Sequence, residues 1–311
     1  DASDAVREKY QDQFLHVLVD EYQDTNKAQY RLTKTFAAKH KNVRVVGDAS
    51  QAIYSWSGAD YRNLMLLKQD FPNLTTIKLE QNYRSSQNIA SAADGDLAQH
   101  SLHPILSLWT QADAGEPLNI YQADDEHDEA GYILRHIRSH QSDPNFSYSQ
   151  FAVLYRTNAQ SRVIEELFIR HGIPYVLVGG VKFYERKEIK DVLAYVRYAH
   201  NPADQVSYDR LQKLGKRRFA KFTTWREKHP DLAQPLNILD GILKATGYLD
   251  KYNPENVEDA ARIENVQELR SVAQEFKELG NFLENIALVE RESQSNTSEG
   301  EASSDAVTLM T

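Results

Sequence analysis

Short apolar runs and amphipathic stretches alternate over the first 80 residues. Apolar runs lie at 16–19, 43–46 and 74–79, and stretches with apolar residues three or four positions apart lie at 27–39 and 61–70. A short apolar run predicts a buried strand, whereas spacing by about 3.6 residues predicts a helix. This alternation predicts a parallel sheet covered by helices.

A second set of strands and helices follows. Strands are expected at 117–121, 151–155 and 175–178, with helices near 125–140 and 161–171. Two α/β units in tandem are the simplest interpretation of this pattern.

The pattern becomes helical from residue 188 onward. Amphipathic stretches cover 188–200, 207–229, 235–249, 258–275 and 279–292. Residues 293–305 are polar and acidic, which is typical of a flexible linker. The final residues are again strand-like, so we expect the chain to be a piece of a longer protein.

Composition and charge narrow the class of protein. The chain has 311 residues, enough for about two domains, and no apolar run of about 18 residues that would span a membrane. The absence of cysteine excludes disulfides, thiolate metal sites and a cysteine nucleophile. Since the acidic first residues do not resemble a signal peptide, we expect a cytoplasmic protein. A net charge of −9 still permits DNA binding, because an internal groove needs only local positive charge.

The segment LVDEYQDTN at 18–26 is the most informative in the chain. An apolar strand that ends in Asp20 and Glu21 places two carboxylates at the carboxyl edge of a parallel sheet, where such folds bind ligands. Asp20 is then placed to hold Mg²⁺ through its water shell, and Glu21 to orient or deprotonate an attacking water. The alternative is a pair of surface acids at a strand end.

Two later segments have matching chemistry. Gln51 follows the second strand and can hydrogen-bond both a γ-phosphate and the attacking water, so it could report nucleotide state to Tyr54 and Trp56. An exposed Trp56 would stack on a DNA base. Arg84 is a candidate arginine finger and Tyr83 a candidate adenine-stacking ring. The alternatives are a surface ion pair for Arg84 and core positions for Tyr83 and Trp56.

These segments together resemble the UvrD/Rep/PcrA-type DNA helicases of superfamily 1. The family's second, third and fourth motifs are similar to VDEYQDTN, GDASQAIYSWSGAD and LEQNYRS, in this order. Similarity continues through FAVLYRTNAQSR and VGGVKFYERKEIKDVLAYVRY, and DAVTLMT resembles the lead-in to the fifth motif. The resemblance implies an ATP-dependent, monomeric helicase or translocase that moves 3′→5′ on single-stranded DNA and its junctions with duplex, in DNA repair or replication.

The resemblance also implies an α/β fold with tandem RecA-like motor domains and an inserted all-helical subdomain. Residues 1–80 would be the C-terminal part of the first motor domain, and 81–186 a partial second one. Residues 187–304 would be the inserted helical subdomain, and 305–311 would return as a strand to the second motor domain.

Family roles transfer to the matching residues. Asp20 would hold Mg²⁺ and Glu21 would be the catalytic base, supported by Gln23 and Asp24. Gln51 would couple the γ-phosphate to DNA, while Tyr83 and Arg84 would contact the nucleotide. The implied DNA contacts are Tyr54, Trp56, Arg156, Asn158 and Arg162, with Phe183 and Tyr184 near the strand.

The chain departs from the family pattern in ways that affect function. The Gly-rich phosphate loop ending in Gly-Lys-Thr/Ser is absent from the sequence, and so is the sixth motif's arginine. Without backbone N–H groups and a lysine around the phosphates, we expect this chain alone to bind ATP poorly and hardly to hydrolyse it.

A basic stretch at 213–228 interrupts the acidic composition. Its Leu-Gly turn opens a helix, where Lys216, Arg217 and Arg218 could bind a DNA phosphate together with backbone N–H groups. The alternative is a solvated basic helix face.

Two other functional classes stay open. The same motifs occur in the motor portion of helicase–nucleases, and a third hypothesis is a nucleotide-free DNA-binding remnant.

Overall fold

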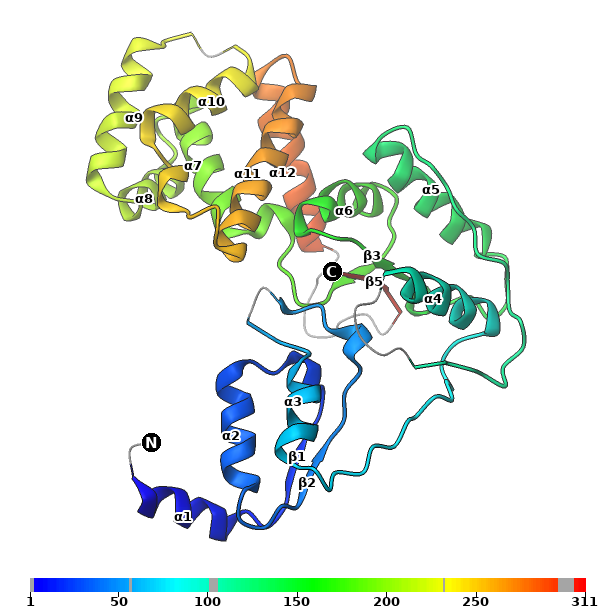
Figure 1. The fold of residues 1–311 in the computed structure, drawn as a ribbon. Helices are drawn as coiled ribbons and strands as arrows, with labels where there is room; N and C mark the ends of the chain where they lie inside the picture. Colours follow the sequence, from blue (N-terminus) through cyan, green and yellow to red (C-terminus); the bar gives the residue numbers. More distant parts are fainter. Residues whose placement is uncertain (1–2, 56–57, 101–105, 232, 296–304) are drawn as a thin grey trace. The chain divides into compact units, whose positions relative to one another are not determined.

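The computed structural model describes residues 3–55, 58–100, 106–231, 233–295 and 305–311, which form two compact units, residues 1–121 and 122–311. Both units combine helices with a parallel sheet, which confirms the predicted α/β class (Figure 1). Most of the predicted linker at 293–305 lies outside the described residues, as does Trp56. The motor-domain boundaries at residues 80, 186 and 304 stay predictions.

The first unit is built around a two-stranded parallel sheet. β1 (Val17–Val19) pairs with β2 (Val43–Val45) in the register Val17 with Val43. The helices are α1 (Asp4–Gln13), α2 (Lys27–Ala37), α3 (Asn63–Asp70) and α4 (Gln87–His100). The predicted strands at 16–19 and 43–46 and the helices at 27–39 and 61–70 are therefore confirmed, with slightly shorter bounds.

The connection from β1 to α2 is fixed by a capping box. The Asn26 side chain accepts hydrogen bonds from the backbone N–H groups of Ala28 and Gln29, and the Gln29 side chain accepts one from the Asn26 N–H. These reciprocal bonds satisfy N–H groups that a helix start leaves unpaired. The start of α2 is thereby set immediately after the DEYQDT turn.

Two predicted strands are wrong. Residues 74–79 and 117–121 are not paired in a ladder, and their apolar side chains are exposed, with Ile77 at 77% and Ile120 at 100%. An extended segment becomes a strand only when a neighbour takes its N–H and C=O groups. Each segment has the apolar alternation of a strand but no paired neighbour in the described part of the chain.

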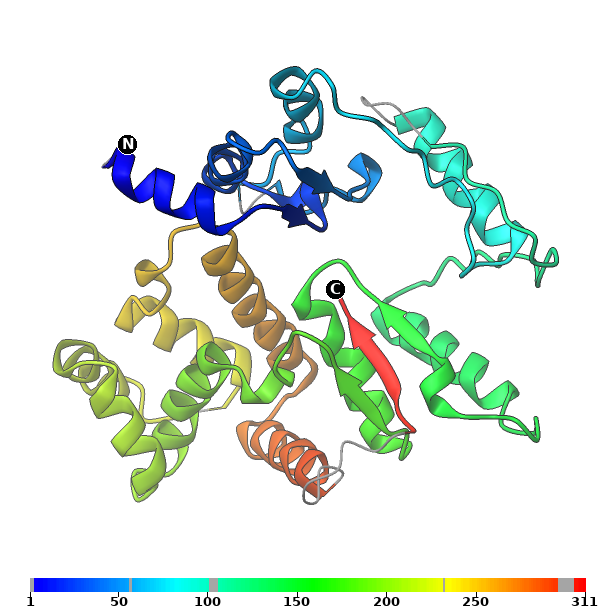
Figure 2. The ribbon, with the colours of Figure 1, turned by 90° about the horizontal axis from the view of Figure 1, so that it is seen from below.

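The second unit contains a three-stranded parallel sheet in the order β3-β5-β4. β3 (Ala152–Leu154) and β4 (Tyr175–Leu177) are joined by α6 (Ser161–Arg170), and α5 (Glu126–Ser139) precedes them. β5 (Val307–Met310), from the far end of the chain, pairs with both (Figure 2). Val307 and Leu309 of β5 are fully buried against α5 and α6.

Six α-helices follow in the described part of the second unit: α7 (Lys187–His200), α8 (Gln205–Lys213), α9 (Lys216–Lys228), α10 (Pro235–Thr246), α11 (Val257–Glu275) and α12 (Leu279–Ser295). Their own core contains the buried aromatic residues Tyr195, Phe222, Tyr248 and Phe282. The amphipathic stretch predicted at 207–229 forms two helices, and the second begins directly after the predicted Leu-Gly turn. They are separated at Gly215, whose φ of 112° is a conformation that only glycine adopts readily.

Candidate functional site

The carboxyl ends of β1 and β2 meet at one edge of the first sheet. The Tyr22 N–H donates to the Val46 carbonyl over 2.9 Å, so the turns after the two strands lie side by side. Asp20 and Glu21 follow β1 directly, and both are exposed. Glu21 has a φ of 46°, in the left-handed region, and its N–H donates to the Asp20 carboxylate over 3.0 Å. A non-glycine residue in this conformation is uncommon, and such residues gather at functional sites.

The Gln23 side chain joins the two turns through hydrogen bonds. It is buried, donates to the Glu21 carboxylate over 2.7 Å, and accepts the Asp48 N–H over 3.1 Å. A Cβ on Gly47 would lie 2.8 Å from the Gln23 side-chain oxygen, so glycine is required for this close approach. The buried amide therefore fixes the direction of the Glu21 carboxylate relative to the turn after β2.

Gln51 belongs to the same network. Its side-chain nitrogen donates to one Asp48 carboxylate oxygen over 3.0 Å, while the other accepts the Ser50 N–H over 2.9 Å. Glu21, Gln23, Asp48 and Gln51 thus form a continuous hydrogen-bonded chain across the sheet edge. The sequence pointed to Glu21 and Gln51 but missed Asp48 as the link between them.

Asp24 lies next to this chain. Burial, together with the negative charge of Glu21, raises the pKa of its carboxyl group above the usual value. One of its oxygens is buried without a hydrogen-bond partner among the described residues. The environment of Asp24 therefore differs from that of Asp20, because Asp24 is half-buried and Asp20 is exposed to solvent.

Tyr83 and Arg84 lie in an exposed turn after residue 80. The Asn82 side chain accepts the N–H groups of Arg84 and Ser85, each over 2.8 Å, which sets the turn. Tyr83 is 84% exposed and donates to the Gln81 side chain, so a core position for its ring is excluded. Arg84 is exposed and has no ion-pair partner among the described residues. No described contact joins this turn to the Glu21–Gln51 network.

The candidate DNA contacts in the first unit are only partly described. Tyr54 follows Gln51 and its ring is 45% exposed. Trp56 lies outside the described residues, so its predicted exposure stays a prediction.

The turn after β3 presents Arg156 and Asn158. The Gln160 side chain accepts the N–H groups of Arg156 and Thr157 over 2.9 and 3.0 Å, which closes a tight turn. Arg156 is exposed and Asn158 is half-buried. Arg156 is therefore accessible to a ligand at the carboxyl edge of this sheet.

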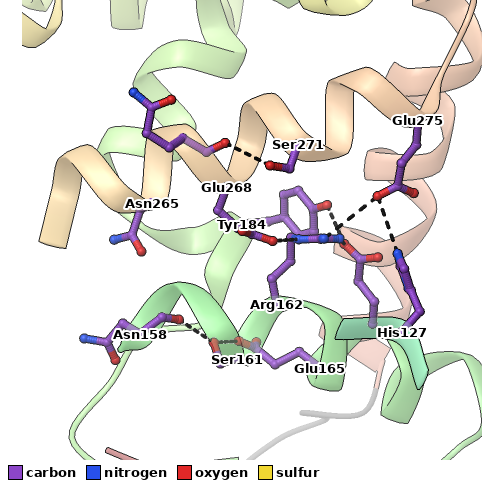
Figure 3. A network of polar contacts seen from close by, with 12 residues as sticks. His127, Asn158, Ser161, Arg162, Glu165, Tyr184, Asn265, Glu268, Ser271 and Glu275 are labelled. Carbon is purple, nitrogen blue, oxygen red and sulfur yellow. Dashed lines mark hydrogen bonds and ion pairs between the residues drawn. The ribbon is translucent and has the colours of Figure 1, made fainter. Parts of the chain in front are cut away.

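Three residues predicted to lie on or near the path of the DNA strand are buried in this structure, and their contact with DNA stays a prediction. Arg162 is 1% exposed, and Phe183 and Tyr184 are also buried. Figure 3 shows Arg162 between α6 and α11, where it bonds Glu268 over 2.6 Å.

Glu166 completes the surroundings of Arg162. Arg162 donates to Glu166 over 3.2 Å, and the Tyr184 hydroxyl donates to the same carboxylate over 2.7 Å. Burial alone would lower the pKa of Arg162, but the charges of Glu166 and Glu268 raise it above its usual value. Arg162 therefore joins two helices and does not present a positive charge to a ligand.

The basic stretch lies at the start of α9. Lys216 and Arg217 are exposed and Arg218 is half-buried in the first turn of the helix. Neither Lys216 nor Arg217 has an ion-pair partner among the described residues. Cations at a helix N-terminus add to the positive end of the helix dipole, so this turn favours an anion such as a phosphate.

The donor groups at the first sheet edge suit a hard cation. Within the described ranges, no three His, Asp or Glu side chains are grouped closely enough to hold a metal ion by themselves. Mg²⁺ is usually bound by one or two carboxylates together with water and substrate phosphates, and Asp20 fits that role. In the part of the chain that the structure describes, no helix is long and apolar enough to cross a membrane.

Comparison with known proteins gives two family matches. Residues 1–72 match the model of the UvrD/REP helicase N-terminal domain, and residues 77–252 match that of the UvrD-like helicase C-terminal domain.

Curated relatives include two bacterial proteins named ATP-dependent DNA helicase PcrA. Those of Staphylococcus epidermidis RP62A and Staphylococcus aureus Mu50 are each 38% identical to this chain over 98% of its length. The chain spans about half the length of both relatives, 48% in each case. The first alignment runs over 355 positions, so that relative contains residues with no counterpart in these 311.

Proposed function

Because this chain belongs to the family of UvrD-like helicases, we propose that it is the ATP- and DNA-contacting part of an ATP-dependent DNA helicase that moves 3′→5′. The observation that supports this most strongly is the hydrogen-bonded chain Glu21–Gln23–Asp48–Gln51 at one sheet edge. It places a candidate base and a candidate phosphate sensor on one network. Two unrelated surface acids would not need such a network.

Asp20 and Glu21 divide the ATP chemistry between them. Mg²⁺, bound with ATP, would neutralise charge on the phosphates. Asp20, exposed at the strand end, would hold the cation through its water shell. Glu21 accepts the proton of the attacking water, and the Gln23 amide keeps its carboxylate in one direction.

Gln51 and Arg84 respond to the γ-phosphate. Gln51 is exposed, and its single described side-chain bond, to Asp48, leaves its carbonyl oxygen available. Arg84 is exposed without an ion-pair partner among the described residues, which suits a residue that meets its anion only when ATP is bound. Tyr83 beside it offers a ring face for the adenine base.

The DNA strand is bound through local positive charge and aromatic rings. Arg156 and Asn158 contact the strand from the turn after β3, and Lys216 and Arg217 bind phosphates from the start of α9. Tyr54 and Trp56 add stacking, at about 1–3 kcal/mol for each stacked base. Binding of this kind does not depend on base sequence and weakens as salt rises.

This chain alone is expected to bind DNA weakly and hardly to hydrolyse ATP. Its 311 residues contain no Gly-Lys-Thr/Ser phosphate loop, so the β- and γ-phosphates lack their main backbone N–H donors.

Fluorescence anisotropy with a labelled oligo(dT) tests the DNA-binding part of this proposal. We expect weak affinity for residues 1–311 that falls steeply with salt, and Arg156→Ala should reduce the slope of log K against log salt by about one. The exposed Arg138→Ala, on α5, is the matched control and should leave the slope unchanged. Undetectable binding at low salt, or nanomolar binding that ignores salt, would contradict the proposal.

A further inference from the structure

Arg186 is a buried arginine at the junction between the sheet and the helices of the second unit. It lies between the turn that contains Phe183 and the first residue of α7, and it is 7% exposed. Its guanidinium carbon lies 5.3 Å from the centre of the Phe183 ring. Burying a guanidinium is unfavourable unless its N–H groups are paired, so its partners show what it holds together.

Four acceptors from three parts of the chain surround the guanidinium. It donates to the Val181 carbonyl over 3.0 Å, to the Asn158 carbonyl over 2.9 Å, to the Ser161 hydroxyl over 3.0 Å, and to the Asn265 side chain over 2.8 Å. Asn265 lies on α11, whereas Asn158 and Ser161 lie in the turn after β3. Arg186 therefore ties that turn to a helix about 100 residues further along the chain.

Two buried acids hold the partners of Arg186 in place. The Ser161 hydroxyl donates to Glu165 over 2.5 Å, and the Asn265 amide donates to Glu188 over 2.6 Å. Figure 3 shows Asn158, Ser161 and Glu165 on one side of the junction and Asn265 on α11 opposite them. Burial lowers the pKa of Arg186, and the charges of Glu165 and Glu188 oppose that effect. The guanidinium and its partners thus form one buried, hydrogen-bonded cluster.

The turn held by Arg186 is the one that presents the candidate DNA contacts. Its first N–H groups bond the Gln160 side chain, and its Asn158 carbonyl bonds Arg186. With both ends fixed, the backbone from which the exposed Arg156 side chain extends is held in place.

We propose that Arg186 is a positioning residue for DNA binding: it holds the 156–161 turn against α11 and so orients Arg156 and Asn158 toward the strand. The proposal rests on the proposed function. A lysine cannot replace Arg186, because one ammonium group lacks the planar fork that reaches acceptors on three segments. The substitution Arg186→Lys therefore keeps the charge and removes the geometry.

The test uses residues 1–311 and labelled oligo(dT) at low salt. Arg186→Lys should weaken binding by about tenfold, because a displaced 156–161 turn no longer directs Arg156 toward the strand. Amide hydrogen exchange should become faster at 156–161. In the Arg156→Ala background, Arg186→Lys should have little further effect on affinity, because it acts through Arg156. Arg197→Lys is the matched control. Arg197 also lies on α7, but its ion pair with Glu290 is partly exposed, so this substitution should change neither readout.

The outcomes separate this proposal from the proposed function. If the unaltered chain does not bind DNA, or Arg156→Ala has no effect, the proposed DNA contact is wrong and this inference falls with it. If binding depends on Arg156 but Arg186→Lys leaves it unchanged, or the two effects simply add, only the positioning role is overturned. If the Arg186→Lys variant does not fold, Ser161→Ala serves instead, because it removes one of the four acceptors. A smaller loss of affinity that vanishes in the Arg156→Ala background supports the proposal. If Ser161→Ala causes no loss of affinity, the proposal is refuted.

Discussion

Replacing Arg162 by methionine tests whether this arginine stabilises the second unit or serves as a DNA contact. Methionine has a similar length and no charge, so the change removes the ion pairs to Glu166 and Glu268 and leaves the packing volume nearly filled. Removing one partner of a buried ion pair leaves an unpaired buried charge, at a typical cost of about 3–5 kcal/mol.

The surroundings of the two acids place the expected cost at the lower end of that range. Glu166 keeps the hydrogen bond from Tyr184 and the more distant Arg170. The Glu268 side chain is 23% exposed and can turn toward water. Glu275, 3.9 Å from Arg162, is 45% exposed and adds little. We therefore expect the free energy of unfolding to fall by about 3 kcal/mol, or a Tm lower by roughly 6–12 °C for a unit of this size.

Urea unfolding followed by far-UV circular dichroism measures this effect. Arg170→Met is the matched control, because Arg170 lies on the same helix, faces the same Glu166 carboxylate over 3.9 Å, and is 56% exposed. Its cost should stay below about 1 kcal/mol. Adding Glu166→Gln to Arg162→Met should recover part of the loss, since it removes the unpaired charge. A cost for Arg162→Met no larger than that of the control would refute the structural role.

Three further predictions concern the first unit. In a chain that also contains the family's phosphate loop, Glu21→Gln should lower kcat by about 10²–10⁴ while sparing nucleotide binding, and wild-type turnover would remove Glu21 from its role as base. In the same chain, Arg84→Ala should lower kcat by about 10³–10⁵ and raise the KM for ATP much less; a change confined to KM would demote it to ground-state binding. Gly47→Ala should destabilise residues 1–311 by about 1–3 kcal/mol, because the added Cβ would lie 2.8 Å from the Gln23 side chain. Gly95→Ala, with open space around the added Cβ, should be neutral or slightly stabilising. Equal effects of the two substitutions in urea unfolding would show that the contact at Gly47 is not tight.

The first sheet edge was predictable because its residues directly follow the two strands in sequence. A strand that ends in two acids and a second strand that ends in Gly-Asp determine which edge the side chains occupy once the sheet is parallel. Glu21 and Gln51 therefore appear where the pattern places them. The hydrogen bond from the Asp48 N–H to the Gln23 side-chain oxygen joins residues 25 positions apart, and no sequence pattern predicts it.

Apolar alternation failed where the neighbour of a strand decides the outcome. Residues 74–79 and 43–46 are both short segments rich in apolar residues, yet only the latter pairs with another strand. Hydrophobic pattern shows that a segment suits a sheet but not that a partner is present. The stretch at 207–229 was predictable in this respect, because its Leu-Gly turn marks the start of the second helix and Gly215 has the positive φ of such a turn.

The segment FAVLYRTNAQSR shows why residue type alone does not identify a DNA contact. Arg156 and Arg162 lie six residues apart in it and have the same charge, yet one is exposed and the other is 1% exposed. The difference comes from α6, which begins at Ser161: its second residue faces α11, where Glu268 supplies a carboxylate 106 positions along the chain. Arg186 is buried for the same reason, through Asn265 one helical turn earlier on α11. Contacts with helix α11 thus bury Arg162 and Arg186, whereas Arg156, which has no described side-chain bond to α11, is exposed to a ligand.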